Sequence, residues 1–189
     1  MIQNSFYKNF KQDTISNEGV FKYFHDLFTR KISNLLTNKT FILRDKKKKN
    51  IENDTFFKFF IENLEQRLDT RALHFLQLLC EGHNMKLQNY LRFQEENRKS
   101  FDLVSIINQY FHALYLNLDV QSFYSFIMCL DVMTEFTQGP CFENQDNLVQ
   151  STLLHTIIEI IKNFCEINEE KDKVYLYQMT LITYKVLFK

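Results

Sequence analysis

The sequence is short of the residues that build tight hairpins. It has three glycines, one proline and no tryptophan among its 189 residues. Because β-hairpins depend on glycine and proline at their turns, this shortage disfavours an all-β fold. Twenty phenylalanines supply large apolar side chains instead, which favours helices packed on helices. We therefore expect an all-α protein.

The sequence also lacks an excess of charge of one sign and lacks long apolar runs. The 23 basic and 23 acidic side chains cancel, so nothing global draws the chain to nucleic acid or to an anionic membrane. A transmembrane helix needs about 20 apolar residues, and the run "IIEIIKNF" is interrupted by Glu159 and Lys162. The first residues lack the apolar core of a secretory signal. We expect a cytoplasmic protein without nucleic-acid binding or membrane insertion, its four cysteines being thiols.

Apolar residues recur at helical spacing along most of the chain. The pattern predicts about eight helices joined by short polar turns, in an armadillo-like α-solenoid or an irregular helical bundle. The last apolar stripe still runs where the sequence stops, so we expect a fragment or a protein built to abut another. The helices are predicted to start at Asn17, Asp54 or Thr55, Asp69, Asn84, Ser100, Asp119, Ser151 and Asn168.

The pattern divides the chain into three parts. Residues 1–17 are mixed and polar, and are expected to form an N-terminal arm that is disordered or loosely docked. Residues 18–68 hold the first helices, separated by a basic linker at 44–53. The lysines at 46–49 repel one another and favour water, so a solvated loop explains them better than nuclear import or membrane binding. Residues 69–189 form the main helical domain.

Two stretches place a glutamate at a helix end. Glu81, in "LCEGHN", precedes Gly82, which is expected to end one helix. Glu135, in "TEFTQGP", comes shortly before Gly139, which is expected to end another. Unpaired carbonyls at a helix C-terminus add negative potential. If packing brings two such carboxylates to about 4 Å, they repel by about 4 kcal/mol, which a divalent cation reverses.

Other chemistry at these stretches is less well supported. The sequence alone favours a solvated side chain for each glutamate over a metal ligand. Cys80 and His83, with Cys141 as a third candidate, have a zinc-like spacing, but no second pair exists. Cys80 lies on an apolar stripe, so we interpret it as a buried thiol rather than a nucleophile. Glycine-rich phosphate loops and nucleophile elbows are missing, and we expect no enzyme.

Two longer stretches resemble a known family. "FLQLLCEGHNMKLQNYLRFQ" at 75–94 and "TEFTQGPCFENQ" at 134–145 look like the paired signatures of the RIH-associated domain. Inositol trisphosphate receptors and ryanodine receptors share this domain. The resemblance covers roughly residues 70–189. Gly82 stands where the family usually has asparagine, and Phe136 where it usually has tyrosine.

The resemblance implies a cytosolic helical module beside a channel pore, coupling ligand and calcium sensing to gating. It also implies a calcium site: Glu81 and Glu135 match its two glutamates, and His83 and Gln138 match residues close around it. The family's remaining ligand is a backbone carbonyl from the channel's C-terminal cytosolic part, which is not in this sequence. The implied site is therefore incomplete, with a dissociation constant on the order of 10⁻⁴ M or weaker.

These observations favour one function and leave one alternative. We expect a non-enzymatic coupling module, a fragment or shortened relative of a calcium-release channel similar to inositol trisphosphate and ryanodine receptors. Such a module works at the cytosolic face of an intracellular calcium store, such as the endoplasmic reticulum. Its expected partners are the remaining domains of a tetrameric channel or another helical protein, and calcium is its only expected cofactor. The alternative is a free-standing helical protein-interaction scaffold without channel activity.

Overall fold

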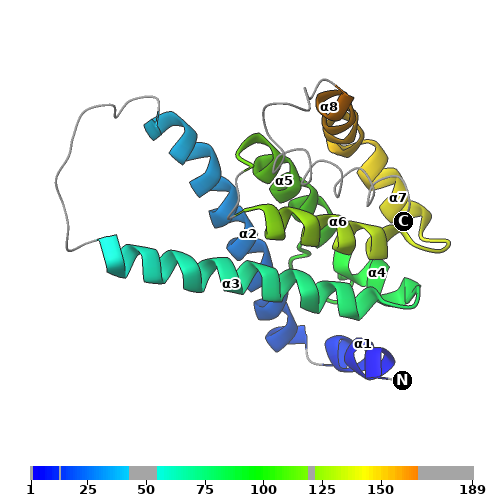
Figure 1. Ribbon diagram of the computed structural model, residues 1–189. Coiled ribbons are helices and arrows are strands. Elements are labelled where there is room, and N and C mark those ends of the chain that lie inside the picture. Colours follow the sequence, from blue (N-terminus) through cyan, green and yellow to red (C-terminus); the bar gives the residue numbers. More distant parts are fainter. Residues whose placement is uncertain (1, 13, 43–54, 119–121, 166–189) are drawn as a thin grey trace.

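The computed structural model describes residues 2–12, 14–42, 55–118 and 122–165 (Figure 1). All regular elements in this part of the chain are α-helices, which confirms the predicted all-α fold of about eight helices. None of the described helices is long and apolar enough to cross a bilayer. The helices are α1 (Ile2–Gln12), α2 (Thr14–Ile42), α3 (Thr55–Cys80), α4 (Met85–Arg92), α5 (Leu103–Leu116), α6 (Phe123–Thr137), α7 (Phe142–Val149) and α8 (Leu153–Cys165).

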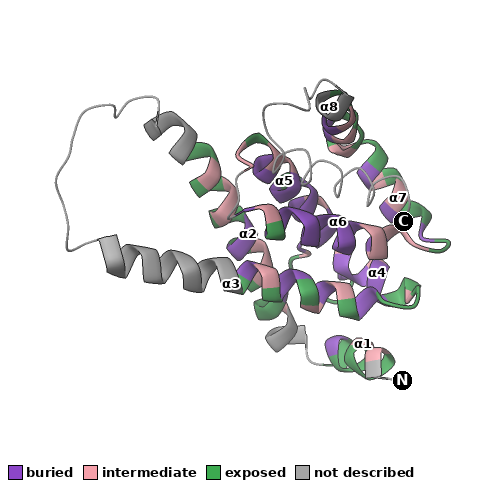
Figure 2. Ribbon diagram, in the orientation of Figure 1, coloured by how far each residue is buried: buried purple, intermediate pink, exposed green. Residues whose placement is uncertain are grey.

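Helix α5 forms the centre of the core. It packs on α2 and α6 and also contacts α4, α7 and α8, and it is buried along most of its length (Figure 2). Phe111 of α5 stacks on Phe126 of α6, with ring centroids 4.5 Å apart. Tyr110 of α5 meets Phe28 of α2 at 5.3 Å. These contacts follow from the apolar stripe of α5, because a helix with so wide an apolar face must be covered on several sides.

Helix α3 runs without a break through Asp69, so the prediction that Asp69 starts a separate helix is wrong. The Asp69 side chain is only 1% exposed. Its Oδ2 atom accepts hydrogen bonds from the Tyr110 hydroxyl of α5 and, at 3.2 Å, the Ser125 hydroxyl of α6. Its Oδ1 atom lies 4.0 Å from Nζ of Lys31 of α2. Aspartate resembles a cap in a sequence because it usually serves its own backbone, whereas here three other helices supply its partners.

The predicted N-terminal arm contains a docked helix, α1, which its mixed composition does not predict. Helix α1 packs against α2 and α4. Phe10 is 8% exposed and lies against Phe21 of α2 and Tyr90 of α4. Helix α2 then starts at Thr14, so Asn17 lies inside this helix and is not its N-cap. A helix as short as α1 depends on such tertiary contacts.

Helix α5 begins two residues later than the predicted cap would place it. Its N-cap is Asp102, whose Oδ1 atom accepts a hydrogen bond from the Ser105 amide at 2.9 Å. Ser100, the predicted cap, donates instead to Oε1 of Gln94 at 3.2 Å. Both residues are good caps, so local preference alone does not choose between them.

Helix α7 is absent from the predicted pattern. It has eight residues, of which only Asn144 and Leu148 are buried, so it shows no apolar stripe. The predicted start of α4 is confirmed, because Oδ1 of Asn84 accepts a hydrogen bond from the Leu87 amide at 3.3 Å. The linker at 44–53, the helix start at Asp119 and the last helix from Asn168 lie outside the described residues.

Candidate functional site

The α3–α4 turn, which contains Glu81, is built on two left-handed residues. Gly82 has φ of 75° and His83 has φ of 61°. Within the described residues, His83 is the only non-glycine residue with positive φ. That conformation costs a residue with a Cβ atom about 1–2 kcal/mol. His83 therefore needs support from neighbouring structure.

The α6–α7 turn lies directly against His83. Gly139 in this turn also has φ of 75°. A Cβ atom built on Gly139 would lie 3.3 Å from the Cβ atom of His83, closer than an ordinary van der Waals contact. Glycine fits here because it needs no space for a side chain and tolerates positive φ. The two turns that the sequence singles out are thus in contact.

Alanine at each glycine should separate conformational cost from contact between the turns. Gly82→Ala is expected to cost about 1–2 kcal/mol of unfolding free energy, because its Cβ atom would meet nothing within 4 Å but φ stays positive. Gly139→Ala adds the encounter with His83 and should cost about 1 kcal/mol more. Urea unfolding of both variants measures the difference. Equal losses would contradict a close contact between the turns.

Two fully buried amide side chains, which we call the amide clamp, join the same segments. Gln88 of α4 donates from Nε2 to the carbonyl oxygens of Glu135 at 2.6 Å and Gln138 at 2.9 Å. Asn144 of α7 donates from Nδ2 to the carbonyl oxygens of Gln88 and Phe136, both at 3.0 Å. Carbonyls at a helix C-terminus lack partners in their own helix. The clamp provides donors at the end of α6 and fixes it against α4.

The predicted calcium ligands lie where the α3–α4 turn meets the α6–α7 turn, a region that we call the junction. The environments of the two ligands differ. Glu81 is exposed at the end of α3, whereas Glu135 is half-buried and its Oε2 atom is buried. Burial raises the pKa of the thiol of Cys80, the residue before Glu81, and the negative charges of Cys141 and Glu135 add to this rise. Of the two predicted neighbours, His83 packs against the α6–α7 turn and Gln138 is held through its carbonyl. The structure thus brings the two helix ends together.

The donor set at the junction fits part of a calcium shell. Calcium takes six to eight oxygen ligands, chiefly carboxylates, carbonyls and water. The carbonyl oxygens of Glu135 and Gln138 already accept from Gln88, and that of Glu81 accepts from Gln3 at 2.6 Å. In the described residues, no group of three or more His, Cys, Asp or Glu side chains is arranged to hold a metal ion. The two carboxylates would therefore need water and oxygens from another surface.

The thiols at the junction favour a structural role over a zinc site. Cys80 and Cys141 are fully buried and form no disulfide. Burial raises the pKa of both thiols. Zinc binds the thiolate form, which such an environment disfavours. The prediction that Cys80 is a buried thiol is confirmed.

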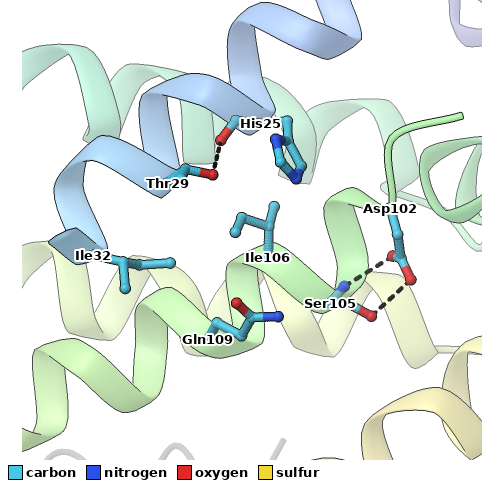
Figure 3. Close-up of a pocket in the computed structure, with 7 residues that line it drawn as sticks. All are labelled: His25, Thr29, Ile32, Asp102, Ser105, Ile106 and Gln109. Atoms are coloured by element: carbon cyan, nitrogen blue, oxygen red, sulfur yellow. Dashed lines mark hydrogen bonds between the residues drawn. The ribbon is translucent and has the colours of Figure 1, made fainter. Parts of the chain in front are cut away.

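A groove between α2 and α5, of about 400 Å³, is a weaker candidate (Figure 3). Most of its polar groups are already bonded to one another. The Ser105 hydroxyl donates to Oδ2 of Asp102 at 2.7 Å, and the Thr29 hydroxyl donates to the His25 carbonyl at 2.8 Å. We assign it no function, because few polar groups remain to orient a ligand. Its lining consists of His25, Thr29, Ile32, Asp102, Ser105, Ile106 and Gln109.

The amide clamp is the part of the junction that sequence reasoning missed. Gln88 shares the buried face of α4 with Leu87 and Leu91, and Asn144 shares that of α7 with Leu148. The one signal in the sequence is an amide side chain on the otherwise apolar face of a helix. Such a side chain indicates a buried polar contact, because a buried amide needs hydrogen-bond partners. The identity of those partners depends on how α4, α6 and α7 meet. No local pattern contains that information.

A family model and a known protein both match the part of the chain that contains the junction. The model of a family described as "RyR and IP3R Homology associated" matches residues 62–161. These residues include both junction turns and the amide clamp. The inositol 1,4,5-trisphosphate receptor itr-1 of Caenorhabditis elegans is 35% identical over 102 residues. That alignment covers 48% of this chain and 4% of the receptor, so the chain spans a small part of its relative.

Proposed function

Because the chain belongs to the RyR and IP3R Homology associated family, we propose that it is a non-enzymatic coupling module of a calcium-release channel. In this proposal it works on the cytosolic side of an intracellular calcium store, beside the other domains of the channel. The contact between the α3–α4 turn and the α6–α7 turn carries the proposal. It supports a shared regulatory calcium site, because Glu81 and Glu135 both flank that contact.

The two glutamates are suited to a cation by their positions. Glu81 and Glu135 lie at the C-terminal ends of α3 and α6, where the helix dipoles add negative potential. A carboxylate there is disfavoured until positive charge arrives. Calcium supplies two charges and prefers hard oxygen ligands. His83 and Gln138 act beside the site, His83 by packing against the opposite turn and Gln138 through the clamp.

Coupling follows from the incompleteness of this donor set. Two carboxylates leave most of the six to eight positions around calcium to water and to a second surface. In a channel, we assign that second surface to the C-terminal cytosolic part. A cation that bridges the two surfaces favours the state in which they meet, by as much as its affinities for the two states differ.

Calcium titration of the 189-residue chain tests the site. The parent should bind with a dissociation constant on the order of 10⁻⁴ M or weaker. Glu81→Gln and Glu135→Gln each keep the shape and remove one charge, and should weaken binding about tenfold. Glu159→Gln on α8 removes a charge away from the junction and should bind like the parent. If Glu135→Gln binds as tightly as Glu159→Gln, the assignment is wrong.

The alternative, a free-standing protein-interaction scaffold, is favoured by apolar side chains exposed on α7 and α8. Phe142 is 67% exposed, Val149 56%, Leu154 46% and Ile158 50%. Exposed apolar side chains of this size suit contact with another protein. A scaffold needs no cation, so a parent chain that binds no calcium at millimolar concentration would favour it over the calcium site.

A further inference from the structure

We propose that Gln3 is a positioning residue for the α3–α4 turn and that helix α1 acts as a strap across the end of α3. The Nε2 atom of Gln3 donates to the carbonyl oxygens of Leu78 at 2.9 Å and Glu81 at 2.6 Å. Helix α1 lies outside residues 62–161, which the family model matches. The strap itself stands on these contacts, whereas its effect on a calcium ligand rests on the proposed function.

Helix α1 lies beside the α3–α4 turn (Figure 1). Aromatic packing holds it there. Phe6 meets Phe75 of α3 edge-on, with ring centroids 6.1 Å apart. Phe10, which is 8% exposed, lies between Phe21 of α2 at 5.5 Å and Tyr90 of α4 at 6.1 Å. The Tyr90 hydroxyl also donates to the Phe10 carbonyl at 3.2 Å. These contacts join α1 to three helices, and Gln3 is its link to the turn.

An ion pair fixes the other end of α1. Nζ of Lys11 lies 2.6 Å from Oε1 of Glu96, in the segment that follows α4. The hydrogen bond from Lys11 lowers the pKa of Glu96. Helix α1 therefore contacts the chain before α4 through Gln3 and the chain after α4 through Lys11. A strap attached at both ends limits how far its N-terminal end can move from the turn.

Gln3 holds the backbone of Glu81 in place through the hydrogen bond to the Glu81 carbonyl oxygen. The carbonyls at the end of α3 lack partners in their own helix, and a donor there offsets the negative end of the helix dipole. The next residues, Gly82 and His83, are both left-handed, so the chain turns sharply just past the bonded carbonyl. Without Gln3 the turn samples other arrangements. The apparent calcium affinity then falls with the fraction of molecules that hold Glu81 in place.

Three substitutions isolate the role of Gln3. Gln3→Glu is nearly isosteric but replaces the donor with an acceptor, which the carbonyls of Leu78 and Glu81 repel. Gln3→Lys keeps a donor and should restore the contact. Gln12→Glu adds the same charge at an exposed position at the other end of α1 and serves as the matched control.

Amide hydrogen exchange of the full 189-residue chain decides whether the strap exists. In Gln3→Glu, the amides of Asn84 and Met85, which bond within the turn, should exchange about tenfold faster, as expected for the loss of two hydrogen bonds. In Gln3→Lys and Gln12→Glu they should match the parent, and amides in the core of α5 should be unchanged throughout. Equal exchange of Asn84 and Met85 in Gln3→Glu and Gln12→Glu overturns the strap.

Calcium titration of uncharged variants tests positioning, and it separates this proposal from the proposed function. Gln3→Met removes the donor without adding charge beside Glu81, and it should bind calcium about fivefold more weakly than Gln12→Met, which makes the same change at the exposed other end of α1. Equal affinities in Gln3→Met and Gln12→Met overturn the positioning role. A parent chain that binds no calcium contradicts the calcium site, whereas the exchange result still decides the strap.

Discussion

Asp69→Ala should lower the free energy of unfolding by about 3–5 kcal/mol, the range found when one partner of a buried charged pair is removed. The hydroxyls of Tyr110 and Ser125 would lose their buried acceptor, and Lys31 would lose the carboxylate that lies 4.0 Å from its Nζ atom. Each buried polar group left without a partner carries a desolvation cost. Because these partners come from α2, α5 and α6, the variant should still unfold in one cooperative transition, at a lower urea concentration than the parent.

A matched control and a double-mutant cycle make this prediction specific. Asp146→Ala, at an exposed position on α7, should stay within about 0.5 kcal/mol of the parent. Tyr110→Phe in the Asp69→Ala background should cost less than Tyr110→Phe alone, because the hydrogen bond is already lost. If Asp69→Ala costs no more than Asp146→Ala, Asp69 does not tie these helices together.

The same carboxyl group gives a pH dependence of known sign. Burial raises the pKa of Asp69 above its ordinary value of 3.8, against the opposing effects of Lys31 and the hydroxyl donors. The native state therefore holds this proton more tightly than the unfolded state. The resulting contribution to stability is full below about pH 3.8 and is lost as the pH rises through the native pKa. Urea unfolding of the parent and Asp69→Asn across this range should show a difference that changes with pH.

Gln88→Met should cost about 2–3 kcal/mol of unfolding free energy, the second large effect. Methionine has a similar length but cannot donate to the carbonyl oxygens of Glu135 and Gln138. Each carbonyl oxygen left without a donor costs about 1 kcal/mol or more of unfolding free energy. Gln109→Met makes the same change at an exposed position on α5 and should be nearly neutral. Similar unfolding midpoints for the two variants would contradict the clamp.

Capping rules predicted the α3–α4 turn well. Gly82 adopts the left-handed conformation expected of a helix terminator, and Asn84 caps α4 through its side chain. Both features depend on a few neighbouring residues, so the sequence contains all the information they need. The same rules were wrong for Asp69, because partners from distant helices determine its conformation.

The contact between the turns, by contrast, depends on tertiary packing. The sequence predicted Glu81 and Glu135 as calcium ligands, partly through family resemblance. It did not identify Gln88 or Asn144, which fix the α6 end against α4 and α7. Nor did it identify α1, although Ile2, Phe6 and Phe10 recur at helical spacing in this short segment.

The most direct test follows the amide signals of Gly82 and Gly139 by NMR while calcium is added to the chain. These glycines belong to the two turns that meet at His83. If one cation is held between the turns, both signals should shift along the same saturation curve, with a dissociation constant on the order of 10⁻⁴ M or weaker. Movement of one signal alone, or of neither at millimolar calcium, would contradict a shared site.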